Sequence, residues 1–174
     1  MAANATVPTN MDGVRDFLGV KRIALVGLSR NPKHFSRMLF RDMCKRGYDM
    51  VPVNPTASEL ENKGCFARLQ DIEPPVGAAL IMTPASDTGR VVRDCAEAGI
   101  RRVWMYRAGG LGAVNPAAVD FCRKEGIHVV EGYCPYMFFP HTPVVHRLHG
   151  LFLKLTGGYP RDVRTSAHRG SVVL

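Results

Sequence analysis

The stretch that decides the fold lies at residues 21–47 and reads KRIALVGLSRNPKHFSRMLFRDMCKRG. It begins with an apolar run of strand length, KRIALVG, which ends in a glycine. Apolar side chains then recur at helical spacing over residues 36–46, at Met38, Leu39, Met43 and Cys44. Gly47 is a typical helix stop signal. A buried strand, a turn and an amphipathic helix in this order predict the first unit of a βαβ fold.

The same alternation continues to residue 131. Further strand-like apolar runs lie at 48–53, 78–82, 102–106 and 127–131, and helix-like stretches at 86–98 and 115–125 each end at a glycine. Consecutive βαβ units predict an α/β fold, a Rossmann-like doubly wound parallel sheet of about five strands. We also expect a short helix over 10–18 with Asn10 or Thr9 as its cap, and we place the lone Trp104 in the core.

The length of 174 residues suits one domain rather than two. We expect this domain at 10–140, followed by a C-terminal helix and extended tail at 141–174. Pro143 opens an amphipathic pattern to about Thr156, with apolar residues Val144, Val145, Leu148, Leu151, Phe152 and Leu155 on one side. Such a stripe predicts packing against the domain itself or against a second subunit, as in a homodimer.

Charge, hydropathy and cysteine content indicate which ligands and which cellular compartment to expect. The net charge is +8, but the positive residues are spread through the chain, which favours a phosphate-rich small ligand and makes nucleic acid an unlikely partner. The start of the chain lacks a signal-peptide pattern, and no apolar run is long enough to span a membrane. Five single cysteines without a C-x-x-C pair suit reduced thiols. We therefore expect a cytoplasmic protein.

Ligands of an open parallel sheet bind beyond the carboxyl ends of its strands. The first turn there offers a glycine, two hydroxyls, two cations and the start of a helix, which together suit a phosphate group. The residues that we assign to this turn are Gly27, Leu28, Ser29, Arg30, Lys33 and Ser36. The alternative is an ordinary strand-to-helix turn capped by Ser36.

A standard NAD site does not fit this turn. The dinucleotide fingerprint G-x-G-x-x-G would need glycines where Ser29 and Pro32 stand. The acidic residue expected after the second strand is also missing, because that turn reads Val53-Asn54-Pro55.

Five motifs in order, GLSRNP, VPVNP, IMTPAS, RRVWMYRAG and EGYCP, resemble those of the small bacterial CoA-binding protein family. That family is similar to the N-terminal CoA-binding domain of the succinyl-CoA synthetase α subunit. The resemblance covers about residues 12–140 and implies coenzyme A as the ligand. It implies contacts from the first turn at Gly27, Ser29 and Arg30, and from the later turns at Val53, Asn54, Pro55, Thr83, Pro84, Arg107, Ala108 and Gly109.

Two departures from the family pattern affect these contacts. Many relatives carry a lysine after the V-N-P motif, where this chain has Thr56, and the W-x-Q-x-G pattern lacks its glutamine. Arg30 or Lys33 could supply the missing cation. The phosphorylated histidine on which ligase catalysis depends lies in a second domain that this sequence does not contain. We therefore expect no enzyme activity, and a module that binds CoA or an acyl-CoA.

Other interpretations stay open. The chain could be an atypical NAD(P)-dependent enzyme, or an interaction protein using the basic C-terminal arm with Arg161, Arg164 and Arg169. The histidines His141, His146 and His149 could share a metal, although a surface or interface role is favoured and we assign no metal. Cys134 could be a reactive thiol near the ligand, but a packed thiol is favoured.

Overall fold

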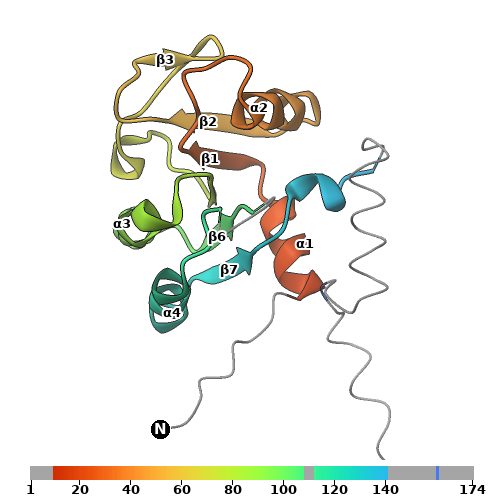
Figure 1. Cartoon of the computed structure of the whole chain (residues 1–174), viewed down its shortest axis with the longest axis vertical. Coiled ribbons are helices and arrows are strands. Elements are labelled where there is room, and N and C mark those ends of the chain that lie inside the picture. The colour runs from red at the N-terminus through yellow and green to blue at the C-terminus, as the bar shows by residue number, and fades with distance from the viewer. Residues whose placement is uncertain (1–9, 108–111, 141–159, 161–174) are drawn as a thin grey trace, which may run out of the picture.

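The computed structural model describes residues 10–107, 112–140 and 160. Its centre is a parallel sheet with the strand order β2-β1-β5-β6-β7 (Figure 1). The five strands are β1 Arg22–Val26, β2 Asp49–Val53, β5 Ala78–Ile81, β6 Arg102–Met105 and β7 His128–Glu131. The predicted Rossmann-like parallel sheet of five strands is confirmed. The expected C-terminal helix and arm lie outside the described residues.

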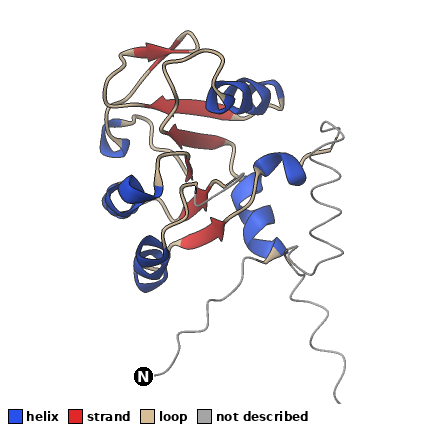
Figure 2. Cartoon of the chain, viewed as in Figure 1, coloured by secondary structure: helices blue, strands red, loops and turns tan. Residues whose placement is uncertain are grey.

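Helices cover both faces of the sheet (Figure 2). One face packs against α3 Ala85–Glu97 and α4 Pro116–Lys124, and the other against α1 Met11–Gly19 and α2 Phe35–Lys45. The alternation within β1 shows why both layers are needed. Ala24 and Val26 lie in the first core, Ile23 and Leu25 lie in the second, and all four side chains are buried.

The face that carries α1 and α2 is completed by the segment after β7. It contains a short 3₁₀ helix, η2 Pro135–Met137. Phe138 packs edge-to-face on the fully buried Trp104, with ring centroids 5.6 Å apart. The Tyr136 hydroxyl donates to Asp42 Oδ2 at 2.7 Å, which ties the segment to α2. The prediction that Trp104 lies in the core is confirmed.

No element was predicted for the segment between β2 and β5. This segment forms a small hairpin, β3 Glu59–Leu60 with β4 Lys63–Gly64, followed by a 3₁₀ helix η1 Leu69–Asp71. The hairpin protects the free edge of β2. Lys63 Nζ donates to Met50 O at 3.0 Å, Phe66 N donates to Pro52 O at 3.1 Å, and Pro52 has no N–H to offer.

Some of the observed helix caps agree with those predicted from the sequence. Asn10 caps α1, its Oδ1 accepting from Gly13 N at 2.8 Å, as predicted. Asn115 caps α4 in the same way and also donates from Nδ2 to Ala85 O at 2.9 Å. Within the described part of the chain, no helix has the length and apolar character needed to cross a bilayer.

Candidate functional site

The candidate site lies where the strand order reverses. The chain passes from β1 to β2 on one side of β1 and returns to β5 on the other, and the helices that follow β1 and β5 pack on opposite faces of the sheet. Gly27 ends the first strand with φ +87, and a Cβ placed there would lie 2.9 Å from Thr83 Cγ2 and 3.0 Å from Thr83 N. The two turns are therefore in direct contact. This contact and the positive φ explain the glycine without reference to a ligand.

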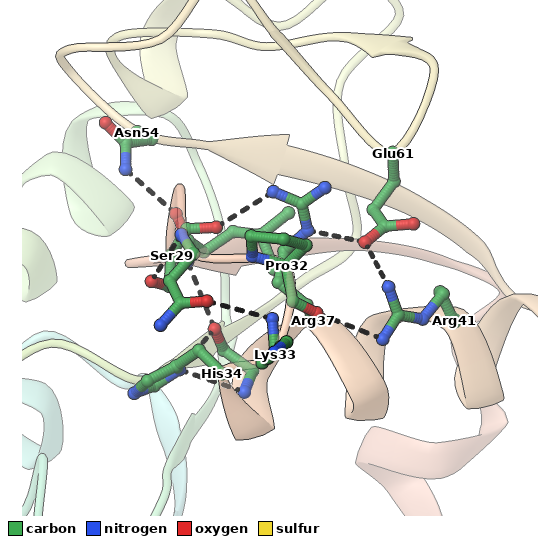
Figure 3. A network of polar contacts seen from close by, with 11 residues as sticks. Ser29, Pro32, Lys33, His34, Arg37, Arg41, Asn54 and Glu61 are labelled. Carbon is green, nitrogen blue, oxygen red and sulfur yellow. Dashed lines mark hydrogen bonds and ion pairs between the residues drawn. The ribbon is translucent and has the colours of Figure 1, made fainter.

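The first turn is closed by its own side chains (Figure 3). Ser36 Oγ accepts from Ser29 N at 3.1 Å, Ser29 Oγ accepts from Asn31 N at 3.1 Å, and Asn31 Oδ1 accepts from Lys33 N at 3.0 Å. The turn is thus an ordered loop with few backbone donors left over. The N–H of Arg30 is one that remains, with no acceptor among the residues that the structure describes.

The alternative interpretation, an ordinary turn capped by Ser36, is wrong about the cap of α2. His34 is the N-cap residue, and its Nδ1 accepts from Ser36 N at 3.2 Å. Ser36 lies inside the helix, fully buried, with its Oγ 2.9 Å from His34 Nδ1. The helix start therefore offers fewer free N–H groups than the sequence suggested, because a side chain already satisfies one of them.

Three cations at this end of the sheet have no acidic partner among the described residues. Within the described ranges, the exposed side chains of Arg30, Lys33 and Arg68 form no ion pair and no hydrogen bond. Several cations at the opposite end are paired. Arg22 and Lys63 both bind Asp49, and Arg102 Nε lies 2.8 Å from Asp16 Oδ2. Arg30, Lys33 and Arg68 therefore place unpaired positive charge at the carboxyl ends of the strands.

A small hollow of about 50 Å³ lies between the turns after β1, β2 and β5. Four of the residues assigned from sequence line it: Gly27, Val53, Pro55 and Thr83. Arg68 and Arg90 line it as well, and sequence reasoning missed both. Arg68 lies in the segment for which no element was predicted, and Arg90 is one of two arginines on α3, so neither carried a local signal. Asp94 also lines the hollow, and its Oδ2 lies 3.5 Å from Arg90 Nη1.

Thr83, which lines this hollow, has an unsatisfied side-chain hydroxyl. Its Oγ1 is buried and has no hydrogen-bond partner within the structure described. Buried hydroxyls are normally bonded, because losing water without a replacement is unfavourable. Pro84 follows as the N-cap residue of α3 and, being proline, gives that helix no side-chain cap. A ligand with polar acceptors would satisfy groups that this part of the fold leaves unused.

The side chain of Asn54 forms hydrogen bonds within the protein at the site. Its Nδ2 donates to Leu28 O at 2.8 Å, while Oδ1 accepts from Thr56 N at 2.8 Å and Thr56 Oγ1 at 2.9 Å. The side chain therefore ties the turn after β2 to the turn after β1. Its amide is engaged within the protein, so Asn54 shapes the site through the two turns it joins.

Arg107 lies apart from the hollow. A Cβ on Gly132 would meet Arg107 Nη2 at 3.1 Å, so the guanidinium lies over the end of β7, at the sheet edge away from β2. Burial raises the pKa of the neighbouring Glu131, against the opposing influence of Arg123 and Arg107. Ala108 and Gly109 lie outside the described residues, as do His141, His146, His149 and the arginines of the basic C-terminal arm.

Cys134 is a packed thiol. The residue is buried beside Tyr136, and burial raises the pKa of its thiol to about 11. At neutral pH the sulfur therefore stays protonated and is a poor nucleophile.

Residues 21–140 match the CoA binding domain family. The chain belongs to this family. The resemblance expected from the five motifs is thereby confirmed, and the Rossmann-like sheet described above is the CoA binding domain of this chain.

Sequence relatives extend the comparison. The uncharacterized protein YneT of Bacillus subtilis is 29% identical over 114 residues, covering 66% of this chain and 82% of that protein. The α subunit of the ADP-forming acetate–CoA ligase II of Pyrococcus furiosus is 26% identical over 134 residues, covering 72% of this chain but 29% of the subunit. The CoA binding domain thus corresponds to a region of a longer ligase subunit, as in the succinyl-CoA synthetase α subunit.

Solved structures show the same fold. A hypothetical protein from Pyrococcus horikoshii OT3 superposes with a TM-score of 0.68 at 24% identity, covering 78% of this chain and 92% of that one. The dinucleotide-forming acetyl-coenzyme A synthetase 1 of Ca. Korarchaeum cryptofilum, in its apo form, gives a TM-score of 0.58 at 27% identity. That match covers 67% of this chain and 26% of the synthetase.

Proposed function

We propose that this chain binds coenzyme A or an acyl-CoA as a non-catalytic nucleotide-binding module. Membership of the CoA binding domain family supports the ligand class. The observation that carries the proposal is the set of unpaired cations, Arg30, Lys33 and Arg68, at the point where the strand order reverses. CoA carries a diphosphate and a 3′-phosphate, so it matches a site with several unneutralised positive charges.

The residues divide between two ends of such a ligand. The side chains of Arg30 and Lys33, with the Arg30 N–H, would hold the diphosphate at the first turn. Arg68 and Arg90 would hold the phosphorylated nucleotide end, and the Thr83 hydroxyl would gain the partner it lacks. Arg68 lines the same hollow as Pro55, so it would compensate for Thr56 at the position where many relatives have lysine. The bound CoA would supply the thiol that carries an acyl group.

A binding role agrees with the chemistry of the nearby polar groups. Ser36 and His34 are within hydrogen-bond distance, as in a nucleophile and its base, but Ser36 is fully buried and its Oγ already accepts from Ser29 N. The thiol of Cys134 is protonated at neutral pH. An NAD-dependent enzyme is disfavoured as well, because Asn54 stands after β2 and offers no carboxylate to a ribose.

The remaining parts of the proposal rest on the sequence pattern. We propose that residues 10–140 form the ligand-binding domain, and that the helix expected within 141–174 packs on this domain or on a second copy. The buried, unpaired thiols Cys95, Cys122 and Cys134 favour a reducing compartment such as the cytoplasm.

Calorimetric titration of the purified protein with CoA, dephospho-CoA and NAD tests the ligand. We expect CoA to bind most tightly and dephospho-CoA more weakly, because it lacks the 3′-phosphate. NAD should be weakest, because it has no 3′-phosphate and finds no carboxylate for its ribose. Binding of NAD as tight as that of CoA would overturn the proposal.

A further inference from the structure

Two arginines of α2 hold the first turn from outside. Arg37 Nη1 donates to Ser29 O at 3.0 Å, and Arg41 Nη2 donates to Pro32 O at 3.3 Å (Figure 3). A trans peptide group is planar, with its C=O and N–H pointing in opposite directions. Holding the oxygen of the Ser29–Arg30 peptide therefore directs the Arg30 N–H away from Arg37. This N–H is the backbone donor that finds no acceptor among the described residues.

One carboxylate fixes both arginines. Glu61 Oε1 accepts from Arg37 Nε at 2.5 Å and from Arg41 Nη1 at 2.9 Å. The side chains of Arg37 and Glu61 are only 11% and 14% exposed, so water weakens this pair less than it weakens a surface pair. Without the carboxylate, Arg37 would keep one carbonyl contact and lose the charge that sets the orientation of its guanidinium.

Glu61 occupies a conformation that its side chain does not favour. Glu61 and Asn62 form the two-residue turn between β3 and β4, and both have φ near +56. Turns of this kind favour asparagine and glycine, and a residue with a long side chain is uncommon there. A strained backbone position occupied by a residue whose side chain makes two charged contacts points to a role for that side chain.

We infer that Glu61 is a positioning residue for the ligand turn, acting through Arg37 to direct the Arg30 N–H toward the bound anion. The inference rests on the proposed CoA site for its ligand. The charge of Glu61 alone acts in the opposite sense, because a carboxylate near the site repels phosphate. Positioning and bare charge therefore predict opposite changes in affinity when the carboxylate is neutralised.

The test compares Glu61→Gln with Glu59→Gln. The control removes the same charge two residues earlier in the chain, where the side chain is exposed and forms no ion pair among the described residues. CoA affinity is measured by calorimetry at a temperature where all variants are folded. We expect Glu61→Gln to bind CoA about three- to tenfold more weakly, the change expected for one weakened hydrogen bond to a charged group. Glu59→Gln should stay within about twofold of the wild type.

A second variant separates positioning from stability. Glu61→Gly removes the carboxylate but suits the positive φ, so its melting temperature should equal or exceed that of Glu61→Gln. Its CoA affinity should nevertheless fall as far. Loss of melting temperature in both variants with unchanged CoA affinity would mean that Glu61 only stabilises the hairpin, and would overturn the inference. Tighter CoA binding by Glu61→Gln would also overturn the inference, because it would show that Glu61 acts on the ligand mainly by repelling its phosphates.

Hydrogen exchange of the ligand-free protein gives a readout that does not depend on CoA. The amides of Ser29, Asn31 and Lys33 are protected by side chains of the turn itself. They should exchange faster in Glu61→Gln than in Glu59→Gln. If the wild-type protein does not bind CoA, the proposed function fails, and this comparison still decides the inference. Equal exchange in the two variants would overturn it.

Discussion

Replacing Gly27 by alanine tests the contact between the turns after β1 and β5. The new Cβ would lie 2.9 Å from Thr83 Cγ2, 3.0 Å from Thr83 N and 3.1 Å from Met82 C. Two of these atoms belong to the backbone, so the clash cannot be relieved by turning one side chain. Gly47 is a matched control, because its φ is +86 against +87 for Gly27 and a Cβ there would have nothing within 4 Å.

The two substitutions share one cost and differ in the other. Alanine at a left-handed position costs about 1–2 kcal/mol in both variants. Overpacking adds about 1–3 kcal/mol at Gly27 only. We therefore expect Gly27→Ala to lower the free energy of unfolding by about 2–5 kcal/mol, and Gly47→Ala by about 1–2 kcal/mol. For a chain of this size each kcal/mol corresponds to roughly 2–4 °C in Tm.

Urea unfolding gives the measurement. The single tryptophan, Trp104, is fully buried in the sheet, so its fluorescence reports the loss of the core. The free energies of the two variants are compared at equal m-values, since a changed slope would signal a different unfolded state. Equal destabilisation by Gly27→Ala and Gly47→Ala would refute the reasoning. The contact with Thr83 would then yield without cost, and the glycine at the end of β1 would need another explanation.

Three further predictions follow from charge and burial. Arg68→Ala should weaken CoA binding by about ten- to hundredfold in calorimetry, the loss of one charge-assisted contact, whereas Lys124→Ala at the other end of the sheet should leave it within about twofold. Iodoacetamide at pH 8 should modify the partly exposed Cys44 before Cys134, whose thiol has a pKa of about 11 because it is buried, and peptide mass spectrometry showing the reverse order would contradict this. Burial opposes ionisation of Asp49, but hydrogen bonds from its two cationic partners outweigh it and lower the pKa. The folded-state pKa of Asp49 lies below the unfolded value of about 3.9, so the stability that its carboxylate contributes is present above a pH of about 3.9 and is lost as the pH falls through the folded-state pKa. Asp49→Asn should therefore lower the free energy of unfolding by less than about 1 kcal/mol at pH 7, and should leave it unchanged at a pH below the folded-state pKa.

The regular βαβ units were predictable because their signals are local. An apolar run, a turn and an amphipathic stretch closed by glycine each occupy neighbouring residues, so the strands and helices around Gly27 could be placed from sequence within a residue or two. Gly27 followed from the rule that ligands bind beyond the carboxyl ends of parallel strands, whereas Val53, Pro55 and Thr83 were implied by the resemblance to the CoA-binding family. The order of strands, turns and helices along the chain was enough to predict both the βαβ units and the first ligand turn.

The segment between β2 and β5 could not be predicted for the opposite reason. Strands of two residues have no measurable period, and the hairpin turn Glu61-Asn62 lacks the glycine that usually marks such turns. Arg68 lies at the hollow only because this segment folds back along β2. The cap of α2 was missed because the choice between His34 and Ser36 depends on where the turn places the helix start, and the bond from Ser29 N draws Ser36 inward.

The two ends of the sheet face different physical demands. At the amino end, Asp16 and Asp49 neutralise neighbouring cations, and the charges there contribute to the folded state. At the carboxyl end, Arg30, Lys33 and Arg68 have no described acidic partner, so their mutual repulsion acts against the folded state whenever no anion is present. A turn that carries such charges must keep its shape by other means. Its carbonyls are held by Asn54, Arg37 and Arg41, and its amides by its own hydroxyl and amide side chains. The hydrogen bonds that fix the turn therefore make it unnecessary for acidic side chains to neutralise Arg30, Lys33 and Arg68. These cations stay free to bind the proposed polyanionic ligand.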